Sequence, residues 1–300
     1  MGIKSLYREY RRTLKGVELE EYLDLVLFRP IAYLYVRAIK DSRITPNQVT
    51  LFSLVLGLAA GWCYWHGTTV WLIAGSVCLF FNNVLDCADG MLARLRGGGS
   101  LIGYIVDGVA DYLTDIALMV GLLHGLATVT GRPGFVWGIG VPAGISWAWW
   151  CAMVDRIRNE WLEKVYDRRR DPAAELAELE ALVRRWRREG SHYGQRVLVY
   201  LYAAYVRLWY SGPIHDRNGA AFGVPTAAWI ERRKPVLRMA VLMGPTMQRS
   251  LIMVAGWLGH MEYFVWTVLV FGTVWGLIVM LARAAADNRL ATMALKGVRD

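Results

Sequence analysis

The sequence has 300 residues, of which 55% are hydrophobic, and it contains 14 Trp and 15 Tyr. The apolar residues form runs of about 20, the length of a helix that crosses a hydrocarbon core, which argues against a soluble globular protein. A formal net charge of +9 would suit nucleic-acid binding, but the basic residues follow a membrane topology, so no nucleic-acid partner is expected. The four cysteines lie in apolar runs without CxxC spacing, which argues against a disulfide framework and a zinc site.

Residues 1–46 are predicted to form a cytoplasmic N-terminus. The first 16 residues are basic, and residues 17–40 mix apolar with charged side chains. That mixture is too polar to span a membrane and predicts an amphipathic helix in the interface, kinked at Pro30. Pro46 then ends this pattern, and Thr45 or Asn47 can cap the helix that follows.

The fold class is predicted to be all-α membrane, with six transmembrane helices over residues 47–66, 70–93, 101–125, 134–158, 237–259 and 262–285. Among the links on one side, Arg132 is the only Lys or Arg. The positive-inside rule therefore places both termini and the other links in the cytoplasm, as expected for an integral protein of the cell (inner) membrane. The predicted domain ranges are 1–46, 47–158, 159–236 and 237–300.

A long cytoplasmic or interfacial insertion, residues 159–236, separates the fourth and fifth predicted helices. Within it, residues 171–189 are typical of a soluble helix, with Asp171 as cap, Pro172 at the first position and acidic residues before basic ones. Residues 196–210 are apolar and aromatic but too short to span comfortably, which favours a position at the interface or against the bundle. A seventh span here would reverse the C-terminus.

Five aspartates interrupt the second and third predicted spans, where an ionised carboxylate is costly and usually functional. Asp86 and Asp89 are three residues apart, and Asp107 and Asp111 are four apart, so each pair shares one helix face. The glycines at 97–99 allow an antiparallel hairpin that brings the two pairs together. Asp115 lies one turn further on, as a supporting partner or a structural polar residue.

Four carboxylates in one pocket need neutralising cations. Hard oxygen ligands favour Mg²⁺ or Mn²⁺ over zinc, and two such ions can bridge a diphosphate. A carboxylate that is not fully engaged can act as general base. On spacing alone, a carboxylate-lined ion-coupled transporter remains the alternative from another class.

Residues 86–111, DCADGMLARLRGGGSLIGYIVDGVAD, fit the motif D-x2-D-G-x2-A-R-x8-G-x3-D-x3-D at every fixed position. This stretch resembles the CDP-alcohol phosphotransferase family, also called CDP-alcohol phosphatidyltransferases. The RITPNQVT stretch before the first span and the six-span layout resemble that family too, whereas residues 159–236 do not.

The resemblance implies roles for individual residues. Asp86, Asp89, Asp107 and Asp111 would hold two Mg²⁺ or Mn²⁺ ions, with Asp111 also the general base. Arg94 would contact the diphosphate and count as catalytic. The CDP moiety would contact Asn47, Thr50, Asp89, Gly90, Ala93, Arg94, Ser100 and Gly103, although Asn47 and Ser100 also suit plain helix caps. Arg249 resembles a basic position that meets an acceptor or donor phosphate, with Asp155 as an alternative partner, and Arg238 is a second candidate.

The implied activity is that of a membrane transferase of substituted phosphate groups in phospholipid biosynthesis. It would transfer such a group from a CDP-linked donor to an alcohol acceptor and release CMP. The donor stays open between CDP-diacylglycerol and a CDP-alcohol; CDP-inositol or a similar CDP-polyol, giving a soluble phosphodiester or a non-phosphatidyl lipid, is a further alternative. The resemblance also implies a homodimer. The basic residues Arg232, Arg233 and Lys234 are expected to anchor the topology.

Overall fold

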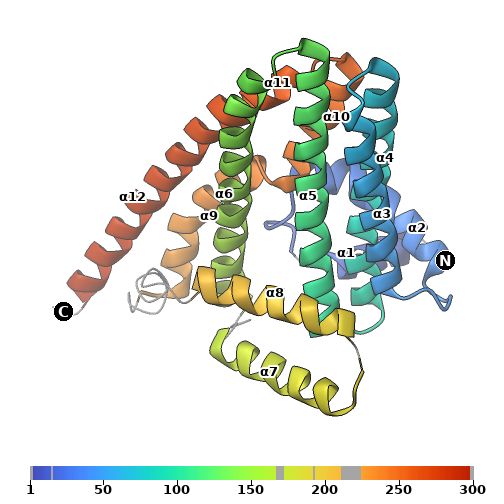
Figure 1. Cartoon of the computed structure of the whole chain (residues 1–300). Helices are drawn as coiled ribbons and strands as arrows, with labels where there is room; N and C mark the ends of the chain where they lie inside the picture. The colour runs from blue at the N-terminus through green and yellow to red at the C-terminus, as the bar shows by residue number, and fades with distance from the viewer. Residues whose placement is uncertain (1–2, 15, 167–171, 192, 211–223, 298–300) are drawn as a thin grey trace. The chain divides into compact units, whose positions relative to one another are not determined.

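The computed structural model describes residues 3–14, 16–166, 172–191, 193–210 and 224–297, and within these ranges it contains helices and no strand. The all-α prediction is therefore confirmed for the described residues. The chain divides into two compact units (Figure 1), one of residues 1–154 with 240–277 and the other of residues 155–239 with 278–300. Three long helices have residues in both units.

The first unit contains the aspartates. Its elements are α1 (Ile3–Thr13), η1 (Asp24–Phe28), α2 (Arg29–Ile39), α3 (Pro46–Trp65), α4 (Thr69–Leu95), α5 (Leu101–Thr130), most of α6 (Pro133–Tyr166), α10 (Pro245–Leu258), α11 (Met261–Trp266), η3 (Thr267–Gly272) and the start of α12 (Thr273–Gly297). Helix α4 is central, because it packs against α1, α2, α3 and α10, while α3 also packs along α5.

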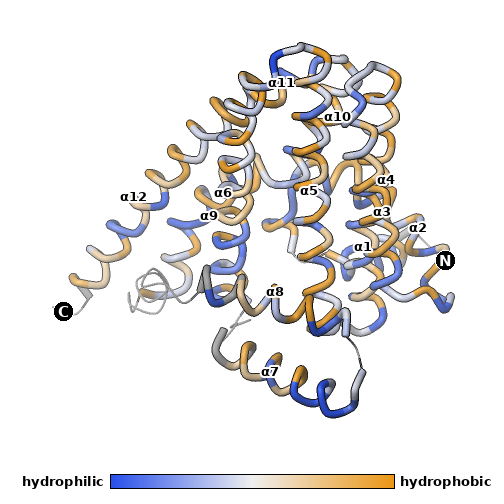
Figure 2. The backbone as a smooth tube through the Cα atoms, in the orientation of Figure 1, coloured by the Kyte–Doolittle hydropathy of each residue, from blue (hydrophilic) through white to orange (hydrophobic). Residues whose placement is uncertain are grey.

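Four helical stretches among the described residues are long and apolar enough to cross a membrane: α3, α4, α5 and Met261–Leu295. They correspond to the first, second, third and sixth predicted spans, and Figure 2 shows apolar residues dominating α3, α4 and α5. The fourth predicted span is a continuous helix, α6, but Pro142 lies inside it and its C-terminal part is charged. The sixth helix continues past the predicted end at residue 285, to Gly297.

The prediction of one continuous helix over residues 237–259 is wrong. The structure interrupts it at Gly244, between α9 (Thr226–Leu242) and α10. Gly244 has an extended backbone and Pro245 starts α10, because proline fits the first turn of a helix but not its interior. The 14 residues of α10 reach only about 21 Å, short of a hydrocarbon core of about 30 Å.

Glycines allow α3 and α5 to pack backbone against backbone. A Cβ added to Gly121 would lie 2.0 Å from the carbonyl oxygen of Gly61, and one added to Gly125 would lie 2.1 Å from that of Tyr64. Small residues at such positions are how helices in a membrane gain close van der Waals contact. This contact holds the C-terminal half of α3 against α5.

We expect Gly121→Val to destabilise the protein by about 1–3 kcal/mol or more. The new side chain would overlap the backbone of Gly61, which cannot change rotamer as a side chain can, so α3 and α5 must move apart. The measurement is the melting temperature in detergent, followed by size-exclusion chromatography. Gly138→Val is the matched control, since a Cβ at Gly138 meets nothing within 4 Å. Equal melting temperatures for the two variants would contradict the close packing.

The N-terminal segment packs against the bundle as two helices. Residues 22–39 are helical with a π-helical turn at Asp24–Phe28, and Pro30 follows directly in the first turn of α2. Sequence analysis did not predict α1 as a separate helix. It is held to α2 by the Lys40–Glu9 ion pair at 3.2 Å and by edge-on packing of Tyr10 and Tyr33.

The second unit contains the insertion. Helix α7 (Pro172–Arg188) matches the predicted soluble helix, while its predicted cap, Asp171, lies outside the described residues. The apolar stretch 196–210 falls within α8 (Tyr193–Tyr210), which packs on α7, and one end of α7 is strongly hydrophilic in Figure 2. The buried residues of this hairpin include Leu179, Val183, Trp186, Val199 and Ala203.

Arg233 differs from the expected surface anchor. Its side chain is 4% exposed and its guanidinium pairs with Asp287 of α12 and, at 3.6 Å, with Glu160 of α6. Arg283 joins the same network through Glu160 at 2.5 Å. Buried charges that pair in this way fix how α6, α9 and α12 meet within the second unit, because separating them would leave an uncompensated buried charge.

Candidate active site

Three of the predicted aspartates meet at the hairpin end of α4 and α5. Asp86, Asp89 and Asp107 each offer a carboxylate oxygen, and these atoms lie within 4.8 Å of one another. The three-residue spacing puts Asp86 and Asp89 on one face of α4. The hairpin returns α5 to that face through Gly97 and Gly98, whose φ angles of +99° and +121° favour glycine.

Thr50 supports this cluster from α3. Its hydroxyl donates a hydrogen bond of 2.5 Å to Asp89 Oδ2, and both residues are buried. The register is set locally, because Thr45 and Gln48 form a capping box that begins α3 at Pro46 and so fixes which residues face α4. Thr50 thus contacts a candidate metal ligand, while its predicted contact with a CDP moiety stays a prediction.

Asp111, the fourth predicted ligand, has a different partner. Its Oδ1 lies 2.9 Å from Nη2 of Arg249, and Arg249 also pairs with Asp115 at 2.8 Å. The Arg249 side chain is 4% exposed and that of Asp111 is 43% exposed. The structure therefore assigns two acidic partners to Arg249, and it leaves one face of the Asp111 carboxylate open to an incoming group.

The residues expected to contact a CDP moiety come from the adjacent ends of α3, α4 and α5. A Cβ on Gly103 would lie 2.9 Å from Asn47 Oδ1, and Ser100 Oγ accepts a 3.0 Å hydrogen bond from the Gly103 N–H. Ser100 is thus the N-cap of α5, while Asn47 lies inside the first turn of α3 and Thr45 is the cap there.

Arg94 and Gly90 lie one turn apart on α4. A Cβ at Gly90 would approach the Arg94 guanidinium to 3.2 Å, so the missing side chain keeps space beside that cation. Arg94 Nε donates to the carbonyl oxygen of Thr13 at the end of α1. Ala93 lies between them in sequence and is half-buried.

Arg238 belongs to the second unit and is exposed, and no role follows from its position.

Sequence reasoning missed the contribution of the N-terminal segment. Glu21 is 2% exposed, and its Oε2 accepts a 2.9 Å hydrogen bond from the Met247 N–H in the first turn of α10. A Cβ at Gly244 would lie 2.2 Å from the Glu21 carboxylate, so the glycine makes room for it. A carboxylate at a helix N-terminus is stabilising. Glu21 thereby holds the helix that carries Arg249.

A second acidic contact anchors the same segment. Arg29 pairs with Glu20 at 2.7 Å, and both side chains are buried. Burial by itself lowers the pKa of Arg29, but the nearby Glu20 carboxylate raises it, and the pKa lies above its ordinary value. The cation therefore stays charged. No local pattern could reveal these contacts, since Glu21 and Met247 are separated by 226 positions.

For the transfer activity that the motif predicts, we expect Glu21→Ala to raise the KM for the acceptor about 10-fold. The reason is that losing a helix-capping hydrogen bond to a charged group costs about 1.5–3 kcal/mol and would loosen α10. The conservative Glu21→Gln keeps an acceptor oxygen and should preserve most of the affinity. Steady-state CMP release at varied acceptor concentration measures both. A fall in kcat alone, with an unchanged KM, would contradict a role through Arg249.

The chain was compared with known proteins. Residues 43–165 match the CDP-alcohol phosphatidyltransferase family. Phosphatidylinositol phosphate synthase of Mycobacteroides abscessus is 32% identical over 36% of this chain and 46% of the relative. That of Corynebacterium glutamicum is 36% identical over 31% of this chain and 40% of the relative. Ceramide phosphoethanolamine synthase of Drosophila melanogaster is 32% identical over 41% of this chain and 34% of the relative.

The match to the CDP-alcohol phosphatidyltransferase family over residues 43–165 confirms the resemblance that the motif indicates. The chain spans less than half the length of each of these three relatives. The matched region contains α3, α4, α5 and nearly all of α6, and thus the three clustered aspartates. Because carboxylate oxygens are hard ligands, Asp86, Asp89 and Asp107 can hold a divalent metal ion.

Proposed function

We propose that this protein is a CMP-releasing transferase of phospholipid biosynthesis that moves a substituted phosphate group from a CDP-linked donor to an alcohol. The observation that carries the proposal is the clustering of Asp86, Asp89 and Asp107 near the turn that joins α4 and α5. The family match over residues 43–165 and the lipid-synthesising relatives support it.

The chemistry follows from the residues at the hairpin. Asp86, Asp89, Asp107 and Asp111 would hold two Mg²⁺ or Mn²⁺ ions, which when bound neutralise the donor diphosphate. Arg94 adds positive charge there, beside the space that Gly90 leaves. The donor's cytidine and sugar would contact the end of α3 and the start of α5, through Asn47, Thr50, Asp89, Ala93, Ser100 and Gly103.

Asp111 is the group we propose as general base. The acceptor hydroxyl oxygen attacks the donor's β-phosphorus, the bond to the bridging oxygen breaks, and CMP leaves with that electron pair. The hydroxyl proton passes to the open face of the Asp111 carboxylate. Arg249 pairs with Asp111 and Asp115. A phosphate that arrives with the acceptor would compete with these two carboxylates for the N–H groups of Arg249.

We consider two main branches of donor and acceptor, and a third choice after them. One branch uses CDP-diacylglycerol with a polar acceptor such as inositol phosphate. The other uses a CDP-alcohol with a lipid acceptor, and a CDP-polyol such as CDP-inositol is the third choice. A buried cation at Arg249 favours an acceptor that carries a phosphate, so we rank the first branch highest.

We further propose the membrane arrangement. Together with the four apolar stretches, α6 and the α9–α10 pair would complete a six-segment domain in the cell membrane. Arg132 is the sole Lys or Arg in the links of one side, which favours cytoplasmic termini and a cytoplasmic site. The N-terminal helices would lie in the interface, and two copies would form a homodimer.

The decisive experiment is CMP release by the purified full chain from CDP-diacylglycerol, CDP-choline, CDP-ethanolamine and CDP-inositol, each with a panel of acceptors. We expect release from one donor class, only with Mg²⁺ or Mn²⁺ present. Release that needs both donor and acceptor identifies the pair. No release from any donor under these conditions would overturn the proposed activity.

A further inference from the structure

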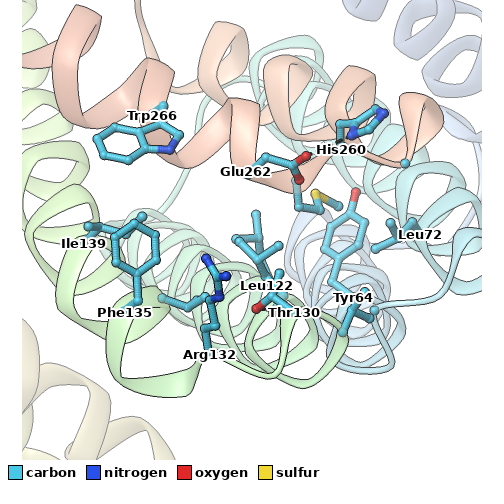
Figure 3. A pocket seen from close by; sticks show the side chains of 16 residues that line it. Tyr64, Leu72, Leu122, Thr130, Arg132, Phe135, Ile139, His260, Glu262 and Trp266 are labelled. Atoms are coloured by element: carbon cyan, nitrogen blue, oxygen red, sulfur yellow. Dashed lines mark hydrogen bonds and ion pairs between the residues drawn. The ribbon is translucent and has the colours of Figure 1, made fainter.

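A cavity lies at the end of the first unit that is opposite the aspartates. It has a volume of about 560 Å³, within the range of small-molecule sites, and it is lined by α5, α6, α11 and the ends of α3 and α4. Its walls are mainly apolar, including Leu122, Leu126, Phe135 and Ile139. Figure 3 shows Leu122, Phe135 and Ile139 facing Trp266 and His260 on the opposite wall.

This cavity is separate from the aspartate site. It is lined by residues at the chain reversals, including Gly67, Thr130 and Gly259. Thr130 lies 23 positions after Asp107 on α5, which corresponds to about 35 Å along the helix. That span is about the thickness of a hydrocarbon core. In the membrane arrangement proposed above, the cavity therefore lies at headgroup level on the side opposite the aspartates.

The cavity contains few charged groups. Arg132 is its only Lys or Arg, and within the described ranges of the chain this guanidinium forms no ion pair. Across the cavity, Glu262 Oε1 accepts a 2.8 Å hydrogen bond from His260 Nδ1. In Figure 3, Arg132 extends from the Phe135 side toward the wall that bears Glu262. The Arg132 guanidinium therefore lies beside an apolar wall, and the one carboxylate of the cavity, Glu262, is paired with His260.

We propose that this cavity binds a phospholipid, with its phosphate on Arg132 and the first part of an acyl chain against the apolar wall. Arginine binds phosphate through paired N–H donors, and Trp266 suits the depth at which indoles collect in a bilayer. A soluble anion would gain nothing from Leu122, Leu126 and Ile139, and a neutral lipid would leave the Arg132 cation without a partner. This lipid site is independent of the transfer activity.

The test is native mass spectrometry of the delipidated full chain after titration with phosphatidylglycerol, phosphatidylethanolamine or diacylglycerol. Arg132→Ala should weaken retention of both phospholipids by at least about tenfold, the effect of losing a charged hydrogen-bonding partner. Diacylglycerol, which lacks phosphate, should bind weakly and respond to neither variant. Arg289→Ala, an exposed arginine of the second unit, is the matched control and should leave retention unchanged.

A second variant tests the cavity without changing any charge. Ile139→Trp should reduce phospholipid retention by filling the cavity, while Arg132→Ala keeps CMP release and melting temperature at wild-type values. Equal retention of diacylglycerol and phospholipids, or unchanged retention in both cavity variants, would overturn the proposal. Loss of retention in Arg289→Ala to the same extent would also overturn it, because binding would then follow overall charge.

Discussion

Replacing Asp111 with asparagine is expected to lower CMP release by about 10²–10⁴-fold, the usual contribution of a general base. Asparagine has nearly the same shape, so the packing of α5 should persist, but it cannot accept the hydroxyl proton. Its amide would also weaken the ion pair with Arg249, whose Nη2 lies 2.9 Å from Asp111 Oδ1. Single-turnover CMP release at saturating donor and acceptor measures the loss.

Asp115→Asn is the matched control for this experiment. It removes the other carboxylate of the Arg249 pair, at 2.8 Å, from a position one turn away on the same helix. We expect it to change the KM for the acceptor by less than tenfold and to leave single-turnover release nearly intact. Turnover within threefold of wild type in Asp111→Asn would contradict the base assignment.

Much of the site is encoded locally, which is why sequence could predict it. Helical periodicity puts Asp86 and Asp89 on one face, and the glycines after Arg94 permit the hairpin that brings Asp107 to them. These relations span fewer than 30 residues. The residues expected to contact the CDP moiety belong to the same short stretch of the chain, except for Asn47 and Thr50 at the start of α3.

The contacts that sequence could not predict are long-range. Nothing near Glu21 indicates that it caps a helix beginning at Pro245, and nothing near Thr13 indicates an Arg94 contact. These pairings depend on tertiary packing of polar groups whose local pattern suits a surface helix equally well. The assignment of Arg249 to Asp111 and Asp115 is of the same kind.

The interruption of the fifth predicted span has a different origin. Its signal was present in the sequence as Gly244-Pro245, but the apolar length of residues 237–259 outweighed it. The break is accommodated because the Glu21 carboxylate accepts an N–H from the first turn of α10. The helix therefore breaks at Gly244-Pro245, as the local sequence favours, because the distant Glu21 carboxylate accepts the hydrogen bond of a backbone N–H that the break leaves unpaired.

Replacing Asp89 with asparagine is expected to weaken Mn²⁺ binding by at least about 100-fold, since losing a ligand costs more than the 10–100-fold typical of an outer-shell partner. Asp89 is 5% exposed and shares the 4.8 Å cluster with Asp86 and Asp107. Titration followed by electron paramagnetic resonance measures Mn²⁺ affinity without donor or acceptor, so the result does not depend on turnover. Thr50→Val, which removes only the hydroxyl donor to Asp89, should fall in the 10–100-fold range.

Asp41→Asn, at an exposed carboxylate before α3, is the control and should bind Mn²⁺ like the wild type. Wild-type affinity in Asp89→Asn would contradict a metal site at the cluster. The same titration separates the two roles given to Asp111. Because its carboxylate is shared with Arg249, Asp111→Asn should weaken Mn²⁺ binding less than Asp89→Asn does while abolishing CMP release. Such a split would assign the metal chiefly to the three clustered aspartates and the proton transfer to the fourth.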